Sequence, residues 1–238
     1  MLTFESMEKI AIASGKGGVG KTSITLILAK YLNDKGYKVG LLDADIYGPN
    51  LTELFSENTQ NIKIKHDPND NKFEPVKLSG LVINSISFVI DHDKAAIWRG
   101  PVLSKAIKQL YLNTNWGDLD YLLIDMPPGT GDAYLTILND LDINKACLIT
   151  VEDDLCISDL KRTQALMKKF NVTILGLIEN MSENFDDNGN VIESDRIKAE
   201  LRENILFSLP RIKRSDFYKE VKQINKLKKY FPENLLEK

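Results

Sequence analysis

A glycine-rich stretch near the start of the chain constrains the fold more than any other feature of the sequence. The apolar run Lys9–Ala13 leads directly into residues 14–23, which have the sequence SGKGGVGKTS. The four glycines leave backbone N–H groups unobstructed, so these groups can turn inward around phosphate oxygens. Their spacing satisfies G-x-x-x-x-G-K-[ST], a pattern that joins a strand to a helix. The stretch therefore predicts a phosphate-binding loop at the edge of an α/β sheet.

Two side chains of this loop have separate chemical tasks. Lys21 supplies a positive charge to the β- and γ-phosphates, and the hydroxyl of Thr22 is a suitable ligand for magnesium. The helix that begins near Gly20 directs the positive end of its dipole at the same anion. We therefore expect ATP and Mg²⁺ as ligands. The predicted nucleotide-binding residues of the loop are Gly15, Lys16, Gly17, Gly18, Val19, Gly20, Lys21, Thr22 and Ser23.

A dinucleotide-binding site is the competing interpretation of the same glycines. Three of them also fit G-x-G-x-x-G, and the acidic residues of Asp43–Asp45 follow at a suitable distance. A dinucleotide site requires close packing of the helix where this chain has Lys21 and Thr22. A lysine followed by a magnesium ligand instead favours the phosphate-binding loop.

Short apolar runs alternate with segments of helical periodicity along the rest of the chain. Continuous apolar strands suit a parallel sheet that is covered on both faces. We therefore predict one P-loop ATPase domain over residues 1–238, an open, doubly wound, mostly parallel α/β sheet with helices on both faces. Two polar stretches, Asn58–Lys77 and Ser182–Ser194, are expected to be insertions or surface loops. The predicted strands are Lys9–Ala13, Lys38–Leu42, Leu81–Ile86, Tyr121–Ile124, Ala146–Val151, Thr173–Ile178 and Ile205–Leu209.

Acidic residues follow two of the predicted strands. Asp43 and Asp45 end one, and Asp125 ends another. In phosphoryl-transfer sites one such carboxylate serves the magnesium shell and a second positions the attacking water. Gly129, four residues after Asp125, lets a backbone amide approach the γ-phosphate. Asp132 precedes a helical stretch, and a helix cap is as good an explanation for it as catalysis.

Charge and composition exclude several other functions. A formal net charge of −3 gives no support for constitutive nucleic-acid binding. No segment is apolar for long enough to span a bilayer, and the acidic start of the chain does not resemble a signal peptide. The two cysteines, Cys147 and Cys156, favour a reducing cytoplasm over a disulfide framework. His66 and His92 lie among polar residues and are expected at the surface.

The C-terminal segment differs in charge from the rest of the chain. From Arg211 onward it contains nine lysines and arginines against four acids. Its apolar residues Phe217, Val221, Ile224 and Phe231 form a stripe that we expect to pack on the sheet. Contact with a membrane is therefore not expected, although this stripe is the one feature that a membrane-targeted protein would share.

Lys16, a second lysine inside the loop, makes the sequence GKGGVGKT resemble that of the MinD/ParA/Mrp superfamily of dimerising ATPases. Three further blocks resemble the Mrp-type branch, which carries iron–sulfur clusters. They are residues 42–50 (LDADIYGPN), residues 98–101 (WRGP) and the long block of residues 116–132. The sequence ENMS at residues 179–182 continues the match, so the resemblance covers roughly the whole chain.

The resemblance implies a role for each matching position. Lys16 would reach across a homodimer to the ATP of the facing subunit, and Lys21 would hold the phosphates of its own subunit. Asp45 would position the attacking water, with Asp43 supporting the site, and Asp125 would hold a magnesium-bound water. The catalytic residues are thus Lys16, Lys21, Asp45 and Asp125. Asn180 would hydrogen-bond the adenine edge, and Pro210 would lie near the base.

One departure from the family concerns its metal chemistry. Many Mrp-type proteins carry Cys-x-x-Cys shortly after the Asn-Met-Ser segment, where two subunits share a bridging iron–sulfur cluster. Here residues 183–189 read ENFDDNG, without a cysteine. Carboxylates are poor ligands for such a cluster. Cys147 lies in an apolar strand and is expected to be a packing residue, whereas Cys156 is expected closer to the dimer face.

Three functions remain compatible with these patterns. The first is an iron–sulfur assembly or carrier factor, and the second is a maturation ATPase that acts on the metal site of a client protein. The third is a localisation or partitioning switch of the MinD/ParA type, acting on a membrane or DNA. The resemblance favours an Mrp-type ATPase that assists cluster or metallocofactor assembly, in which ATP binding would close a homodimer and hydrolysis would reopen it, and the switch is the alternative. The sequence does not identify the client protein.

Overall fold

The computed structural model describes residues 7–45, 65–67, 72–88, 100–185, 191–193, 204–212 and 224–233, together with residues 201, 221 and 235. Several positions discussed above lie outside the described residues. They are Ile46 to Asn50, His92, Trp98, Arg99, Asp186 to Gly189 and Phe217. Of His66, only its backbone in a short strand is described.

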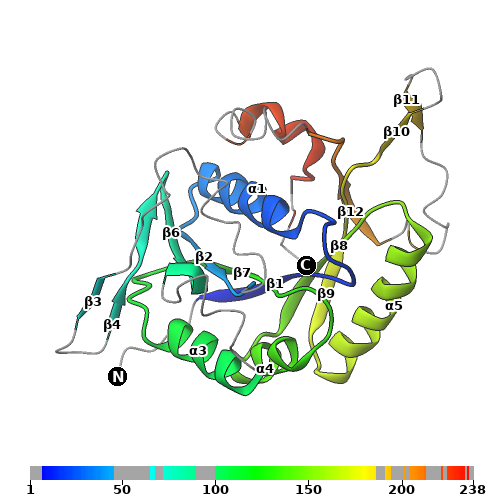
Figure 1. Cartoon of the computed structure of the whole chain (residues 1–238). Coiled ribbons are helices and arrows are strands. Elements are labelled where there is room, and N and C mark those ends of the chain that lie inside the picture. Colours follow the sequence, from blue (N-terminus) through cyan, green and yellow to red (C-terminus); the bar gives the residue numbers. More distant parts are fainter. Residues whose placement is uncertain are drawn as a thin grey trace.

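An eight-stranded sheet forms the centre of the molecule (Figure 1). Its order is β12-β9-β8-β1-β7-β2-β6-β5, and every neighbouring pair is parallel except β5 and β6 at one edge. The strands span Glu8–Ser14 (β1), Val39–Asp43 (β2), Val76–Leu78 (β5), Leu81–Ser85 (β6), Tyr121–Asp125 (β7), Lys145–Thr150 (β8), Thr173–Glu179 (β9) and Ile205–Ser208 (β12). This is the predicted open, mostly parallel sheet, and each predicted strand is confirmed to within one residue at either end.

Helices cover both faces of the sheet. Figure 1 shows α1 (Lys21–Asp34) on one face and α3 (Gly100–Leu112), α4 (Asp132–Asp140) and α5 (Asp154–Lys169) on the other. Each face has its own core of buried side chains, one packed under α1 and one under α3, α4 and α5. Strands that are buried on both sides need apolar residues at successive positions, which explains their continuous apolar runs. Since the strands are parallel, their carboxyl ends share one edge of the sheet.

Three described residues of the C-terminal apolar stripe pack in the core on the α1 side. Val221, Ile224 and Phe231 are all buried there. The ring of Phe231 stacks on Tyr31 of α1 at a centroid distance of 4.4 Å and also contacts Phe207 of β12. Two short 3₁₀ turns, η2 (Ile224–Lys226) and η3 (Lys228–Tyr230), carry this part of the chain. The stripe therefore covers α1 and the adjacent strand end, as expected for a packing segment. No described helix has the length and apolar character to span a membrane.

The two stretches expected as surface loops contain short strands. Within Asn58–Lys77, β3 (Lys65–Asp67) pairs with β4 (Lys72–Glu74), and β5 begins at Val76. Within Ser182–Ser194, β10 (Glu183–Phe185) pairs with β11 (Val191–Glu193). The loop prediction was wrong at these strands, because turn-forming residues dominate the local composition while pairing between distant segments is not encoded locally. A third 3₁₀ helix, η1 (Ile86–Phe88), directly follows β6.

Candidate nucleotide-binding site

The glycine-rich loop leaves the carboxyl end of β1 and enters α1, as the motif predicts. Ser14, the last residue of β1, donates a hydrogen bond from its hydroxyl to the backbone oxygen of Lys16 (2.8 Å). Gly18 and Gly20 have φ values of 82° and 91°, a left-handed conformation that favours glycine. Residue Val19 between them is buried, whereas Lys16, Gly17 and Gly18 are exposed. The loop is thus anchored at both ends and open in the middle.

Close packing also explains two of the glycines. A Cβ atom added to Gly15 would lie 2.4 Å from the backbone carbonyl carbon of Asp159, in α5. A Cβ atom added to Gly20 would lie 2.4 Å from the side-chain nitrogen of Asn180. The loop is therefore held between α5 on one side and the end of β9 on the other, with no room for larger residues.

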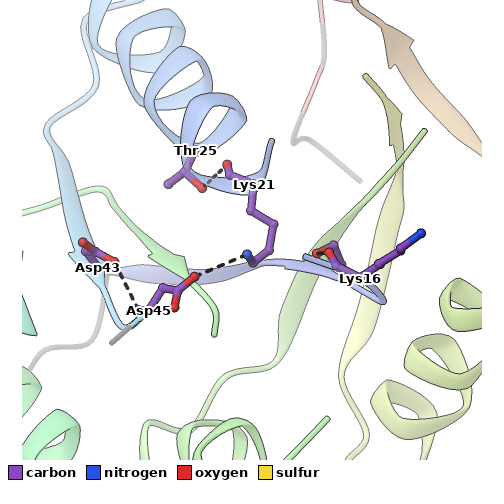
Figure 2. A network of polar contacts seen from close by, with 6 residues as sticks. Lys16, Lys21, Thr25, Asp43 and Asp45 are labelled. Atoms are coloured by element: carbon purple, nitrogen blue, oxygen red, sulfur yellow. Dashed lines mark hydrogen bonds and ion pairs between the residues drawn. The ribbon is translucent and has the colours of Figure 1, made fainter. Parts of the chain in front are cut away.

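Lys21 and Asp45 face each other beneath the loop (Figure 2). The ammonium nitrogen of Lys21 is 3.8 Å from Oδ2 of Asp45, and their side chains are only 6% and 10% exposed. Lys21 is the first residue of α1 and Asp45 follows β2, so the fold brings the lysine at the end of the loop to the acidic end of the strand. Two residues that the sequence predicts to act on the same phosphate are therefore brought together.

Asp125 and Asp43 lie side by side at the ends of β7 and β2, where they are register partners. Both are fully buried. Burial raises the pKa of Asp125, and the charge of Lys21 lowers it less. Burial and the neighbouring Asp125 likewise raise the pKa of Asp43.

Neither carboxylate oxygen of Asp125 has a hydrogen-bond partner among the described residues. The nearby hydroxyl of Thr25 donates instead to the backbone oxygen of Lys21 (2.9 Å). A buried carboxylate without a partner is costly unless a ligand satisfies it. Its oxygens, with the half-buried hydroxyl of Thr22, are the hard donors that Mg²⁺ prefers. The residues present therefore fit a magnesium ion, which would take its other ligands from phosphate and water.

Lys16 points away from Lys21 on the other side of the loop (Figure 2). Its ammonium nitrogen is 3.8 Å from Oδ1 of Asp153, and the two side chains are 44% and 46% exposed. Asp153 also caps α5, because its carboxylate accepts a hydrogen bond from the backbone N–H of Cys156 (3.0 Å). That bond lowers the pKa of Asp153. Asp153 was not among the predicted site residues, although an Asp before a helical stretch is a recognisable cap signal.

Asn180, which follows β9, contacts the glycine-rich loop. Its side-chain nitrogen donates to the backbone oxygen of Val19 (2.9 Å). Backbone bonds from Leu209 to Glu179 (2.8 Å) and from Ser182 to Leu209 (3.0 Å) join the ends of β9 and β12. Pro210, the next residue after Leu209, therefore lies close to the strand end that carries Asn180.

Gly129 lies in the turn between β7 and α4, at the same edge of the sheet. Its φ of 78° is left-handed, which explains a glycine at this position. The neighbouring Pro128 approaches the loop, since a Cβ atom on Gly17 would lie 3.9 Å from the Cβ of Pro128. This turn thus borders the glycine-rich loop on the side of Asp125.

The two cysteines are free and buried. Burial raises the pKa of Cys147, in β8, to about 12, which suits a packing residue. Burial and the carboxylate of Asp153 raise the pKa of Cys156. Within the described ranges, no group of three or more His, Cys, Asp or Glu side chains is arranged to hold a metal ion.

Comparison with known proteins agrees with this geometry. A family model described as a ParA-type NUBPL iron-transfer P-loop NTPase matches residues 5–200. The iron-sulfur cluster carrier protein of Escherichia coli (strain K12) is 43% identical over 173 residues, which are 73% of this chain and 46% of that protein. The protein of the same name from Rickettsia bellii is 41% identical over 185 residues, 77% of this chain and 57% of that one. The chain spans about half the length of the curated relatives that it matches.

Solved structures share the fold. A nucleotide-binding protein from Archaeoglobus fulgidus, in complex with ADP, has a TM-score of 0.72 and 30% identity, covering 92% of this chain and 87% of that chain. The septum site-determining protein MinD from Pyrococcus horikoshii, complexed with Mg-ADP, has a TM-score of 0.62 and 23% identity, covering 93% and 97%. The resemblance to the MinD/ParA/Mrp superfamily is thereby confirmed, and the chain belongs to the ParA-type family of NUBPL iron-transfer P-loop NTPases.

Proposed function

We propose that this chain binds ATP with Mg²⁺ through residues 15–23 and hydrolyses it. The observation that carries the proposal is the group formed by Lys21, Asp45 and Asp125 beneath the loop. One buried cation faces one carboxylate at 3.8 Å, and a second carboxylate has no hydrogen-bond partner among the described residues. The cation would pair with phosphate oxygens and the unpartnered carboxylate with a metal ion, so this group of charges suits a triphosphate with Mg²⁺.

Each residue of the group has a defined role in this proposal. Lys21 and the backbone amides of the loop bind the phosphates. Thr22 and Asp125 hold Mg²⁺, which when bound neutralises charge on the phosphate oxygens. Asp45 accepts a hydrogen bond from the attacking water and orients it in line with the terminal phosphorus. Catalysis is then positioning and charge stabilisation, without a covalent intermediate.

The adenosine end of the nucleotide is assigned to the ends of β9 and β12. Asn180 can accept and donate through one amide, which is what an adenine edge requires, and Pro210 would border the base. The amide of Asn180 that now bonds Val19 would then hold the loop and the base together. On the opposite side, Gly129 would let its backbone amide approach the γ-phosphate.

We propose that two copies of the chain close around ATP, with Lys16 of each reaching the nucleotide of the other. The exposure of Lys16 and its direction away from Lys21 support this arrangement. The eight strands form one sheet, so we further propose that the chain acts as a single ATPase domain. The two free cysteines are consistent with a cytoplasmic location.

The cycle of binding and hydrolysis is proposed to serve assembly or transfer of an iron–sulfur cluster or another metallocofactor to a client protein. Membership of an iron-transfer family and the names of the bacterial relatives support this role. Because the chain lacks the Cys-x-x-Cys of many relatives, a cluster would be cargo handled with a partner rather than a resident group. The alternative, a MinD/ParA-like switch on a membrane or DNA, is less supported, since the apolar stripe around Phe231 packs against α1.

Calorimetric titration with ATP, with and without Mg²⁺, tests the nucleotide proposal directly. We expect the affinity for ATP to depend on Mg²⁺. A separate assay of phosphate release should show slow hydrolysis, and the absence of both would refute the proposal. Anaerobic incubation with iron and sulfide tests the role of the cluster. If the purified dimer develops an iron–sulfur absorption band, the chain carries a cluster itself. Co-sedimentation with liposomes or DNA, with and without ATP, tests the alternative.

A further inference from the structure

Two backbone N–H groups of the turn that carries Asp45 donate hydrogen bonds. The backbone N–H of Ala44 donates to the backbone oxygen of Asp125 (3.0 Å), which ties the turn to β7. The backbone N–H of Asp45 donates to Oδ1 of Asp43 (3.1 Å), a bond that Figure 2 shows from close by. The carboxylate of Asp43 therefore holds the backbone from which the Asp45 side chain extends.

Ser85 holds the other oxygen of that carboxylate. It is the last residue of β6 and the register partner of Asp43 across the sheet. Its hydroxyl donates to Oδ2 of Asp43 at 2.8 Å, and both residues are fully buried. The two oxygens of Asp43 thus have one partner each, a backbone amide and the Ser85 hydroxyl.

The direction of the Ser85 hydrogen follows from its other contacts. The backbone N–H of Ser87 donates to the Ser85 oxygen (3.2 Å), and the hydroxyl oxygen of Ser87 lies 2.8 Å away. The Ser85 hydroxyl has a single hydrogen, which it donates to Asp43, so its oxygen accepts from the backbone N–H and the hydroxyl of Ser87. The start of η1 therefore orients Ser85, and Ser85 orients Asp43.

We propose that Ser85 is a positioning residue for ATP hydrolysis, acting through Asp43 to aim Asp45 at the attacking water. The proposal rests on the function proposed above. Without the hydroxyl, one buried oxygen of Asp43 loses its partner, and the carboxylate gains by rotating toward another donor. Rotation releases the backbone of Asp45, so the water is held in a wider range of directions. Small losses of orientation are expensive in a reaction that depends on alignment.

A purely structural role for Ser85 makes a different prediction. If its hydrogen bond only joins β6 to β2, removing it lowers thermal stability and affects all activities through the folded fraction. A positioning role lowers kcat while leaving KM for ATP unchanged, because Lys21 and the loop still bind the phosphates. Thr163 provides a matched control, since it is a fully buried hydroxyl in α5 whose bond goes to the backbone oxygen of Asp159 (3.0 Å).

The test measures steady-state hydrolysis and thermal stability of the full chain with Mg²⁺ and ATP. We expect Ser85→Ala to lower kcat about tenfold with KM within about twofold, and Ser85→Thr to recover most of the rate. Thr163→Val should leave kcat unchanged. In an Asp43→Asn background, Ser85→Ala should cost little more, because both changes break the same chain of contacts.

Three results would overturn the proposal: a kcat for Ser85→Ala within twofold of the parent, a matching loss in Thr163→Val, or additive effects of Ser85→Ala and Asp43→Asn. The parent protein separates this failure from that of the proposed function. A parent that hydrolyses ATP alongside an unaffected Ser85→Ala variant removes only the role of Ser85. A parent without magnesium-dependent hydrolysis removes both.

Discussion

The two lysines of the loop form ion pairs of the same length in very different surroundings. Lys21 lies 3.8 Å from Asp45, and Lys16 lies 3.8 Å from Asp153. The first pair is almost fully buried, whereas both members of the second are nearly half exposed. A buried charge that loses its partner is left in a medium of low dielectric constant, while an exposed one is rescued by water.

The Lys21 side of the site is therefore complete within one chain, whereas the Lys16 side is open to a further partner. On the Lys21 side, the chain supplies the cation and the carboxylates itself, and a ligand must match what is already there. On the Lys16 side, the lysine can leave Asp153 at little cost and take another partner. The proposed homodimer uses that freedom, because the facing nucleotide would replace Asp153. Substitutions on the two sides should therefore differ in what they impair.

The largest effect is expected for Lys21→Ala, which should lower the affinity for Mg-ATP at least about a thousandfold. The variant removes the positive charge that binds the phosphates. It also leaves Asp45 buried without its cation, which should lower the free energy of unfolding by about 3–5 kcal/mol. Calorimetric titration measures the affinity. Lys30→Ala, on the same helix, is the control, since the amine of Lys30 donates to the backbone oxygen of Ser79. Equal affinity in Lys21→Ala and the parent would remove the phosphate-binding interpretation altogether.

Asp45→Ala should lower the hydrolysis rate about a thousandfold while nucleotide binding is retained, because loss of a water-positioning group falls on the chemical step. Release of phosphate from preformed Mg-ATP complex in a single turnover measures the chemical step apart from binding. The variant should also hold the ATP-bound state long enough to retain a client protein in a pull-down. If the variant loses binding and hydrolysis to the same extent, Asp45 is a ligand-binding residue and not a catalytic one.

Lys16→Ala tests whether Lys16 acts on the nucleotide of the facing subunit. We expect the affinity of the monomer for Mg-ATP to stay within about threefold, whereas hydrolysis and ATP-driven dimerisation should fall about a hundredfold, as for other groups that stabilise transition-state charge. Sedimentation velocity and phosphate release, measured on the same samples, separate the two quantities. The opposite outcome, loss of affinity with normal dimerisation, would show that Lys16 serves the nucleotide of its own subunit.

Residues on both sides of the loop could be predicted from the sequence, Lys16 through the resemblance to the family and the Lys21 side through local patterns as well. The loop, Lys21, Asp45 and Asp125 follow from local patterns, and a parallel sheet brings their strand ends to one edge. The strands were predictable because burial on both faces leaves long apolar runs, as in Tyr121–Asp125.

The partners of these residues depend on strand order, which no local pattern contains. Ser85 contacts Asp43 only because β6 lies beside β2, 42 positions away in sequence. Asp153 meets Lys16 because α5 packs against Gly15 closely enough to exclude a Cβ atom. The small pairings of β3 with β4 and of β10 with β11 escaped prediction for the same reason, since polar turn residues outweigh the short strands between them.

The smallest effect, and the one that sharpens the comparison most, is expected for Asp153→Asn. Asparagine is as good a helix cap as aspartate and can still accept the hydrogen bond from Cys156, so the variant removes the charge without uncapping α5. If Asp153 competes with the facing nucleotide for Lys16, its neutralisation should strengthen ATP-driven dimerisation roughly two- to fivefold, as expected for an exposed pair.

Salt dependence distinguishes that competition from a change of shape. An exposed ion pair is screened, so the advantage of Asp153→Asn over the parent should shrink between low and high ionic strength. Asp118→Asn, which breaks the exposed pair with Lys38 elsewhere on the surface, controls for the change of net charge. Weaker dimerisation of Asp153→Asn would mean that the carboxylate itself contacts the second subunit. Asp153 would then not compete with the facing nucleotide for Lys16, and the two lysines of the loop would differ only in how exposed their ion pairs are.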